Sequence, residues 1–210
     1  MISSLKKTCQ NKVMPNDRSL VLASTSRYRK ALLQRLGYAF ECVDPAVEET
    51  VPPGEAAAAA ALRLAESKAR AVAPRHRQAL IIGADQVATC GALRLDKPGT
   101  HDKAVQQLTA MSGRTVCFDT ALAVLDARTG TLRSRVVPTK VQFRDLSHAQ
   151  IEAYLRREQP YDCAGSAKAE GLGIALIARI ESDDPTALIG LPLIALTELL
   201  ALSGLPALRA

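Results

Sequence analysis

Short apolar runs and longer alternating segments divide the chain into predicted strands. Residues 20–23 (LVLA) and 80–83 (LIIG) are continuous apolar runs, which are typical of strands buried on both faces. Residues 116–125 and 132–143 alternate between apolar and polar positions on either side of a turn at residues 126–130. This arrangement predicts a long antiparallel hairpin.

Helical patterns occupy most of the intervening sequence. We expect helices within residues 31–36, 55–73, 101–111 and 192–202, and a further helix beginning at Ser147 as its N-cap. Shorter strands are expected at residues 40–43 and 174–180, and a hairpin turn at Cys90-Gly91. The order predicts an α/β fold with a mixed sheet, in which residues 18–210 form a single domain after a basic extension at residues 1–17.

The composition is that of a folded globular protein, with an uneven distribution of charge. The chain has 210 residues, 27 Lys and Arg against 21 Asp and Glu, and eight of the basic residues lie within residues 1–35. The sequence has no Trp, only 4 Tyr and 3 Phe, and no aromatic cluster on which bases could stack. The basic end therefore favours a localised phosphate site over a general nucleic-acid surface.

Other residue patterns narrow the compartment and the chemistry. No apolar run is long enough to cross a membrane and residues 1–15 lack a secretion signal, so we expect a cytoplasmic protein without a membrane partner. The five cysteines are widely spaced and form no CxxC pair, which argues for reduced thiols that act mostly as small core residues. The three histidines show no metal-binding spacing.

The segment from Ser24 to Lys30 (STSRYRK) combines hydroxyl groups and cations at the start of a predicted helix. Unpaired backbone N–H groups and the helix dipole favour an anion at this position. The alternative is an N-capping serine followed by solvated cations. The segment is not a Walker loop, because GxxxxGK[ST] is absent.

Five further residues are candidates for the same site. Asp85 follows an apolar run, so its carboxylate is either paired, bound to a metal or functional, or else caps a turn. Glu49 and its neighbour Glu48 are either a pair of ligands for Mg²⁺ or part of a solvated acidic loop. Lys68 and Lys97 are either phosphate ligands or ordinary surface lysines. Several of these segments lie beside predicted strand ends, so one cleft could gather them around a metal-bridged polyphosphate.

The same segments carry a family resemblance. The motifs are LVLASTSRYRKALL at 20–33, VEET at 47–50, ESK at 66–68, GADQV at 83–87, DKP at 96–98, SGR at 112–114, AGS at 164–166, EG at 170–171 and GLPL at 190–193. In this order they resemble the Maf family of nucleotide pyrophosphatases. The chain looks most like the branch that hydrolyses 7-methyl-GTP, because Tyr28, Gln86 and Glu170 stand where the branches differ.

The resemblance implies a fold and an activity. The fold is an elongated mixed β-sheet flanked by helices, with a central nucleotide-binding cleft, as in Maf and ITPase-like proteins. The activity is hydrolysis of the bond between the α and β phosphates of a nucleoside triphosphate, which yields a nucleoside monophosphate and pyrophosphate. A divalent cation, Mg²⁺ or Mn²⁺, is the implied cofactor. A homodimer built on the apolar segment at residues 187–205 is one assembly that the sequence permits.

Roles transfer to individual residues through the same motifs. Asp85 would accept the proton of the attacking water, and Glu49 with Asp85 would bind the metal. Tyr28, Gln86 and Glu170 would select the base. Phosphate ligands would be supplied by a set of hydroxyl and basic residues: Ser24, Ser26, Arg29, Lys68 and Lys97.

Three other functions remain as alternatives. The sister branch hydrolyses dTTP and UTP, but it would have Thr at Gln86 and Gln at Glu170. A regulator of cell division would bind nucleotides without turnover, whereas the retained Asp85, Lys68 and Lys97 favour an enzyme. An RNA-binding module would show strongly salt-dependent affinity for oligonucleotides.

Overall fold

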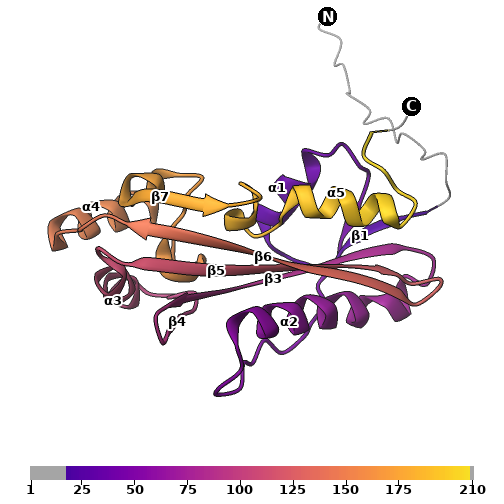
Figure 1. Ribbon diagram of the computed structural model, residues 1–210, viewed down its shortest axis with the longest axis horizontal. Helices are drawn as coiled ribbons and strands as arrows, with labels where there is room; N and C mark the ends of the chain where they lie inside the picture. The colour runs from indigo at the N-terminus through magenta and orange to yellow at the C-terminus, as the bar shows by residue number, and fades with distance from the viewer. Residues whose placement is uncertain (1–17, 209–210) are drawn as a thin grey trace, which may run out of the picture.

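A computed structural model describes residues 18–208, so the extension at residues 1–17 lies outside the described part. A seven-stranded mixed sheet runs along the molecule in the order β2-β1-β3-β5-β6-β7, with β4 paired to β3 (Figure 1). The strands are β1 (Leu20–Leu22), β2 (Glu41–Cys42), β3 (Leu80–Cys90), β4 (Leu93–Leu95), β5 (Thr115–Asp126), β6 (Thr131–Phe143) and β7 (Ile177–Ser182). The predicted α/β fold with an elongated mixed sheet is confirmed.

Within residues 18–208, five α-helices and four short 3₁₀ helices flank this sheet. The α-helices are α1 (Arg27–Gln34), α2 (Ala57–Val72), α3 (His101–Met111), α4 (His148–Glu158) and α5 (Leu193–Leu202). The 3₁₀ helices are η1 (Ala73–Arg75), η2 (Ala164–Ser166), η3 (Leu172–Leu176) and η4 (Ala187–Ile189). Helix α2 lies on one face of the sheet, α1 and α5 lie on the other, and α3 and α4 lie toward one end (Figure 1).

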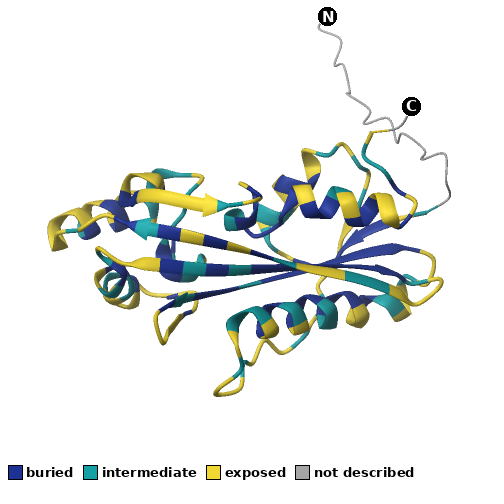
Figure 2. Ribbon diagram, viewed as in Figure 1, coloured by how far each residue is buried: buried dark blue, intermediate teal, exposed yellow. Residues whose placement is uncertain are grey.

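Buried side chains form three clusters that follow this layering. One lies between the sheet and helices α1 and α5, and a second lies under α2. The third joins α3 and α4 to the distal halves of β5 and β6. Figure 2 shows the same division, with buried residues along the central strands and exposed ones on the outer faces of the helices. These contacts hold the two ends of the sheet apart and leave the middle for the cleft described below.

The predicted hairpin is confirmed, because β5 and β6 pair in antiparallel register around the turn at residues 127–130. The position of Asp85 is different from the prediction. The strand predicted at residues 80–83 would end before Asp85, whereas β3 continues to Cys90 and Asp85 lies in its middle. Antiparallel pairing with β5 extends β3, since Asp85 pairs with Ala121 far beyond the parallel neighbour β1.

This extension leaves one edge of β3 without a neighbouring strand. The parallel register with β1 ends at Leu22 and Ile82, and the pairing with β4 begins only at Ala88. Within residues 18–208, the stretch between Ile82 and Ala88 therefore pairs with no strand on that side. Asp85 and Gln86 lie in this unpaired stretch. No strand lies beside them on that side, which leaves room for the side chains of a functional site.

Helix α2 packs unusually close to this stretch of β3. A Cβ atom on Gly83 would lie 2.0 Å from the carbonyl oxygen of Ala65, so only glycine permits this approach. Small alanines on the buried face of α2 serve the same purpose, including Ala61 and Ala69, which are fully buried. The close packing brings Lys68, on the same helix, against the unpaired edge of β3.

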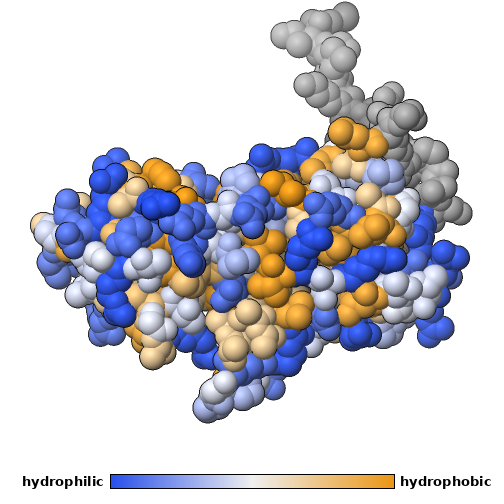
Figure 3. Space-filling view, in the orientation of Figure 1, coloured by the Kyte–Doolittle hydropathy of each residue, from blue (hydrophilic) through white to orange (hydrophobic). Residues whose placement is uncertain are grey.

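The C-terminal segment is mostly committed to the core of its own chain. Leu196 and Leu200 of α5 are fully buried, whereas Ile194 and Leu202 are more than half exposed. On the face in Figure 3, hydrophobic residues mix with hydrophilic ones around α5. The homodimer therefore remains a prediction. Among the described helices, none combines the length and apolar character needed to cross a bilayer.

Candidate active site

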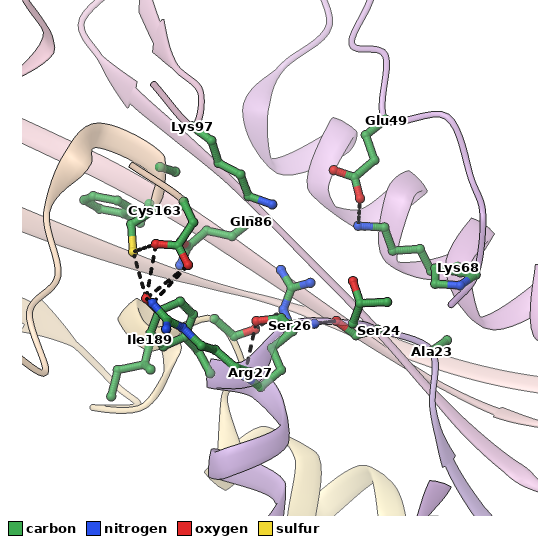
Figure 4. Close-up of a pocket in the computed structure, with 18 of the residues that line it drawn as sticks. Ala23, Ser24, Ser26, Arg27, Glu49, Lys68, Gln86, Lys97, Cys163 and Ile189 are labelled. Atoms are coloured by element: carbon green, nitrogen blue, oxygen red, sulfur yellow. Dashed lines mark hydrogen bonds and ion pairs between the residues drawn. The ribbon is translucent and has the colours of Figure 1, made fainter. Parts of the chain in front are cut away.

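A cavity of about 460 Å³ opens at the gap beside β3. Several segments meet there: the β1–α1 loop, the loop after β2, α2, β3, the loop after β4, the loops on either side of η2, and η4. In Figure 4, Glu49 and Lys68 lie on one side of the cavity, Gln86 and Cys163 lie on the other, and Lys97 extends into the space between them. All the residues predicted for the site line this cavity except Asp85, which contacts it through Lys68.

The β1–α1 loop places hydroxyl groups and a guanidinium at the N-terminus of α1. Ser26 is the N-cap, and its Oγ accepts a hydrogen bond from the backbone N–H of Arg29 at 3.4 Å. Ser24 is buried and its Oγ accepts from the N–H of Ser26 at 3.1 Å. Arg29 donates from Nε to the carbonyl oxygen of Gly190 at 2.9 Å, which fixes the direction of its guanidinium. The N-capping serine is thus confirmed, but Arg29 is partly buried and is not a fully solvated cation, and the loop still presents cations and hydroxyls to the cavity.

Lys68 joins two carboxylates at the wall of the cavity. Its Nζ lies 2.5 Å from Oδ1 of Asp85 and also forms an ion pair with Glu49. Lys68 and Asp85 are almost completely buried, whereas the Glu49 side chain is 54% exposed. The structure therefore contradicts the interpretation of Lys68 as a surface lysine. An ammonium and a carboxylate at such depth require each other, because either alone would be costly to desolvate.

Glu49 lies in a strongly positive environment. Partial burial on its own would raise the pKa of this carboxyl, but the hydrogen bond and charge of Lys68, with Lys97 and Arg29, hold the pKa below its usual value. Burial lowers the pKa of the Arg29 guanidinium, which Asp85 and Glu49 counteract. Lys97 is exposed in the loop before α3. Three cations thus converge with two carboxylates at this end of the cavity, which we call the phosphate end.

The carboxylates of Glu49 and Asp85 are the candidate metal donors. No cluster of three or more Asp, Glu, His or Cys side chains suited to a metal ion is present among residues 18–208. Mg²⁺, however, commonly takes one or two protein carboxylates together with substrate phosphates. Because Glu49 and Asp85 both reach Lys68 Nζ, they lie close enough to fit a cation that arrives with a nucleotide.

The opposite end of the cavity holds an aromatic ring, a thiol and carboxylates. The guanidinium of Arg27 lies 4.8 Å from the ring centre of Tyr28 and forms an ion pair with Asp162 at 3.2 Å. The Tyr28 hydroxyl lies 3.5 Å from Sγ of Cys163, and burial and that contact raise the pKa of the phenol. Burial raises the pKa of Cys163 to about 11, so the thiol is protonated at neutral pH. With Glu170, these residues form what we call the base end.

The two remaining residues of the base end are Gln86 and Glu170. Gln86 donates from its amide nitrogen to Oγ1 of Thr120 at 2.8 Å, and it also contacts carbonyl oxygens of η4. Glu170 is exposed and projects from a loop that Glu158 holds at two points. Glu158 Oε1 lies 2.5 Å from Nζ of Lys168, and Oε2 accepts from the N–H of Leu172 at 2.8 Å.

Several residues of the cavity escaped the sequence analysis. Asp162 and Cys163 carry no recognisable pattern, and the cysteines were expected mainly in the core. Of the four cysteines in the described part of the chain, all are free thiols, but only Cys90 is buried. Asp44 accepts from the N–H of Ala46, as a turn residue does, and it also lines the cavity. Only the folded arrangement of distant loops reveals these contributions.

Comparisons with known proteins identify the family of this chain. The model of the Maf-like protein family matches residues 19–202. A 7-methyl-GTP pyrophosphatase of Thiobacillus denitrificans is 60% identical over 190 residues, which cover 90% of this chain and 94% of that protein. Proteins of the same name from Cupriavidus pinatubonensis and Methylobacillus flagellatus are each 57% identical, over 89% and 88% of this chain and 94% and 96% of their own lengths. The chain therefore belongs to the family of Maf-like proteins.

Proposed function

We propose that this protein is a nucleoside triphosphate pyrophosphatase that hydrolyses 7-methyl-GTP to 7-methyl-GMP and pyrophosphate. The observation that carries the proposal is the division of one cavity into a cationic phosphate end and a base end with carboxylates and an aromatic ring. A nucleotide with a charged base needs both, because its triphosphate is anionic and its methylated guanine is cationic. The names of the relatives support the same substrate.

The phosphate end binds and orients the triphosphate. Ser24 and Ser26 supply hydroxyls, and Arg29 supplies a guanidinium whose direction is set by Gly190. Lys68 and Lys97 add positive charge along the cavity wall. Transfer of a phosphoryl or nucleotidyl group needs little covalent help, so positioning and neutralisation of developing charge provide most of the acceleration.

Asp85 acts on the attacking water. The water oxygen forms a bond to one phosphorus of the α–β anhydride, the bond from that phosphorus to the bridging oxygen breaks, and the proton passes to the Asp85 carboxylate. In the free protein Lys68 occupies one oxygen of this carboxylate. Binding of the triphosphate gives the Lys68 ammonium an anionic partner in addition to Asp85 and Glu49, which frees Asp85 to accept the proton.

Glu49 and Asp85 would hold the divalent cation that the family implies, together with phosphate oxygens. A bound Mg²⁺ or Mn²⁺ would supply additional positive charge against the charge that develops on the phosphates. Lys68 shares both of these carboxylates in the free protein, so it preserves their positions until substrate and cation arrive.

At the base end, we assign selection of the base to Tyr28, Gln86 and Glu170. Tyr28 offers an aromatic face to the purine, and a cationic ring favours such a face. Glu170 adds negative charge to this end of the cavity, whereas the charge of Asp162 is already compensated by its ion pair with Arg27. An uncharged guanine would gain less from the Glu170 carboxylate than the methylated base does.

Release of pyrophosphate from a panel of triphosphates tests the function. The panel contains 7-methyl-GTP, GTP, dTTP and UTP, each with Mg²⁺ or Mn²⁺, for the wild type and for Asp85→Asn. We expect turnover of 7-methyl-GTP that falls at least about a hundredfold in the variant, because a positioned base commonly contributes that much. Preference for dTTP and UTP would instead assign the sister activity, and binding without turnover would support the regulator.

A second comparison tests the role of charge at the base end. Glu170→Gln keeps the size and hydrogen-bonding capacity of the side chain and removes its charge. We expect the preference for 7-methyl-GTP over GTP to fall several-fold, because only the methylated base is cationic. Glu48→Gln is the matched control, since Glu48 is exposed and does not line the cavity. An unchanged preference in Glu170→Gln would contradict this role.

A further inference from the structure

Thr120 is a buried residue of β5 whose hydroxyl faces the back of the base end. Its side chain is fully buried, and its Oγ1 donates to the carbonyl oxygen of Ala187 at 2.9 Å. Because that hydroxyl hydrogen is used, the oxygen is left to accept, and it accepts from Nε2 of Gln86 at 2.8 Å. Thr120 thus connects the sheet, the η4 turn and one residue of the base end.

The surroundings of Gln86 permit only one orientation of its amide. Nε2 faces Oγ1 of Thr120 and the carbonyl oxygens of Ala187 and Leu188, the latter two at 3.1 and 3.2 Å. All three are acceptors, so a rotated amide would place its own oxygen against three oxygens. The two N–H groups of this nitrogen are thus shared among three acceptors.

The Gln86 carbonyl oxygen is consequently left for a ligand. It has no protein partner among residues 18–208. Every buried side-chain nitrogen or oxygen atom in that part of the chain does have a partner, so this oxygen is not a buried atom. Gln86 lines the cavity, so this oxygen opens onto it. A group in this position accepts hydrogen bonds and does not donate them.

We propose that Thr120 is a positioning residue that locks Gln86 as an obligatory hydrogen-bond acceptor at the base end. The inference rests on the proposed function and deepens it, because it specifies the edge of the base that Gln86 meets. That edge must present N–H donors, as guanine does with N1–H and its 2-amino group. A purine with an unprotonated ring nitrogen at this position, such as adenine, would oppose two acceptors and bind poorly.

Steady-state kinetics with 7-methyl-GTP provide the first test. Thr120→Val removes the hydroxyl at nearly constant volume, and we expect KM to rise about three- to tenfold with kcat within about twofold of wild type. Thr120→Ser keeps the hydroxyl and should restore KM. Thr139→Val is the matched control, because Thr139 is an equally buried sheet residue that bonds Ser182 at 2.9 Å and lies outside the cavity.

These results separate positioning from a merely structural role. A general loss of folding would lower the active fraction, and with it the apparent kcat, in both valine variants. An unchanged KM in Thr120→Val would overturn the proposal, and so would equal impairment by valine and serine, which would assign the effect to packing. Thermal unfolding of all three variants identifies any that fail to fold.

Nuclear magnetic resonance of the free protein tests the amide orientation without turnover. The Gln86 side-chain NH₂ signals are identified by their loss in Gln86→Met, and their hydrogen exchange is then measured. We expect both protons to exchange slowly in wild type and Thr120→Ser, and at least one to exchange faster in Thr120→Val. Rapid exchange in wild type overturns the inference even if 7-methyl-GTP is hydrolysed, whereas absent turnover with protected protons would refute the proposed function alone.

Discussion

Removal of the Lys68 ammonium tests how the buried charges beside β3 support the fold. Lys68→Met keeps the length and most of the volume of the side chain, but it leaves the Asp85 carboxylate, which is only 8% exposed, without its hydrogen-bonded partner. Breaking a buried pair in this way commonly costs about 3–5 kcal/mol. The Glu49 side chain is 54% exposed, so water can replace its contact with Lys68, and the charge of Arg29 still acts on Asp85. We therefore expect a loss of unfolding free energy at the lower end of this range, about 3 kcal/mol.

The assay is thermal and urea unfolding at pH 7 in a double-mutant cycle with Asp85→Asn. A loss of about 3 kcal/mol corresponds to a fall in Tm of about 6–12 °C for a domain of this size. The double variant should lose less than the sum of the single variants, with a coupling of about 1–3 kcal/mol. Lys103→Met on the exposed side of α3 controls for loss of a lysine. A loss below about 1 kcal/mol in Lys68→Met, or strict additivity, would refute the reasoning.

Three further predictions follow from the same structure. Gly83→Ala should destabilise the fold by at least about 2 kcal/mol in urea unfolding, because its Cβ would meet backbone 2.0 Å away; wild-type stability would contradict the close packing. Burial raises the pKa of Asp126, but the Arg18 hydrogen bond and charge outweigh it and lower the pKa below 3.8. The resulting stability is present above the ordinary pKa and is lost as the pH falls below it. In Asp126→Asn we therefore expect the free energy of unfolding to fall less steeply as the pH is lowered. An unchanged dependence on acid pH would contradict this. Because the pKa of Cys163 is about 11, its alkylation by iodoacetamide should be slow at pH 8 and rise about tenfold per pH unit to pH 10, as followed by mass spectrometry with Cys163→Ser as the blank. Fast labelling at pH 8 would be inconsistent with a protonated thiol.

Local patterns predicted the elements whose boundaries local chemistry decides. Helix α3 begins after Thr100, which caps it, and α4 begins after Ser147, whose side chain forms a capping box with Gln150. The β5–β6 hairpin followed from alternation on both sides of a turn. Each cap and its partner lie within a few residues of each other, and the hairpin strands are adjacent in the chain, so a continuous stretch of sequence contained both partners.

Asp85 and Lys68 show what local patterns miss. The apolar run before Asp85 resembles a strand that ends there, yet β3 continues because β5 supplies a partner from more than 30 residues away along the chain. Lys68 lies in an alanine-rich helix, and a lysine in a helix is usually a surface residue. It is buried because glycine at position 83 lets α2 approach the sheet and because Asp85 compensates its charge. Both outcomes depend on pairing and packing between elements, which no single segment encodes.

The base end depends still more on tertiary structure, because its residues come from four regions of the chain. Tyr28 belongs to α1, Gln86 to β3, and Asp162 and Glu170 to loops after α4. The direction of the Gln86 amide depends in turn on Thr120 of β5. A motif comparison finds Gln86 but not the group that orients it, since a hydroxyl inside a strand has no sequence pattern of its own. Selectivity for a base is therefore decided partly by buried neighbours, and substitutions at such positions can change the substrate while every motif residue is retained.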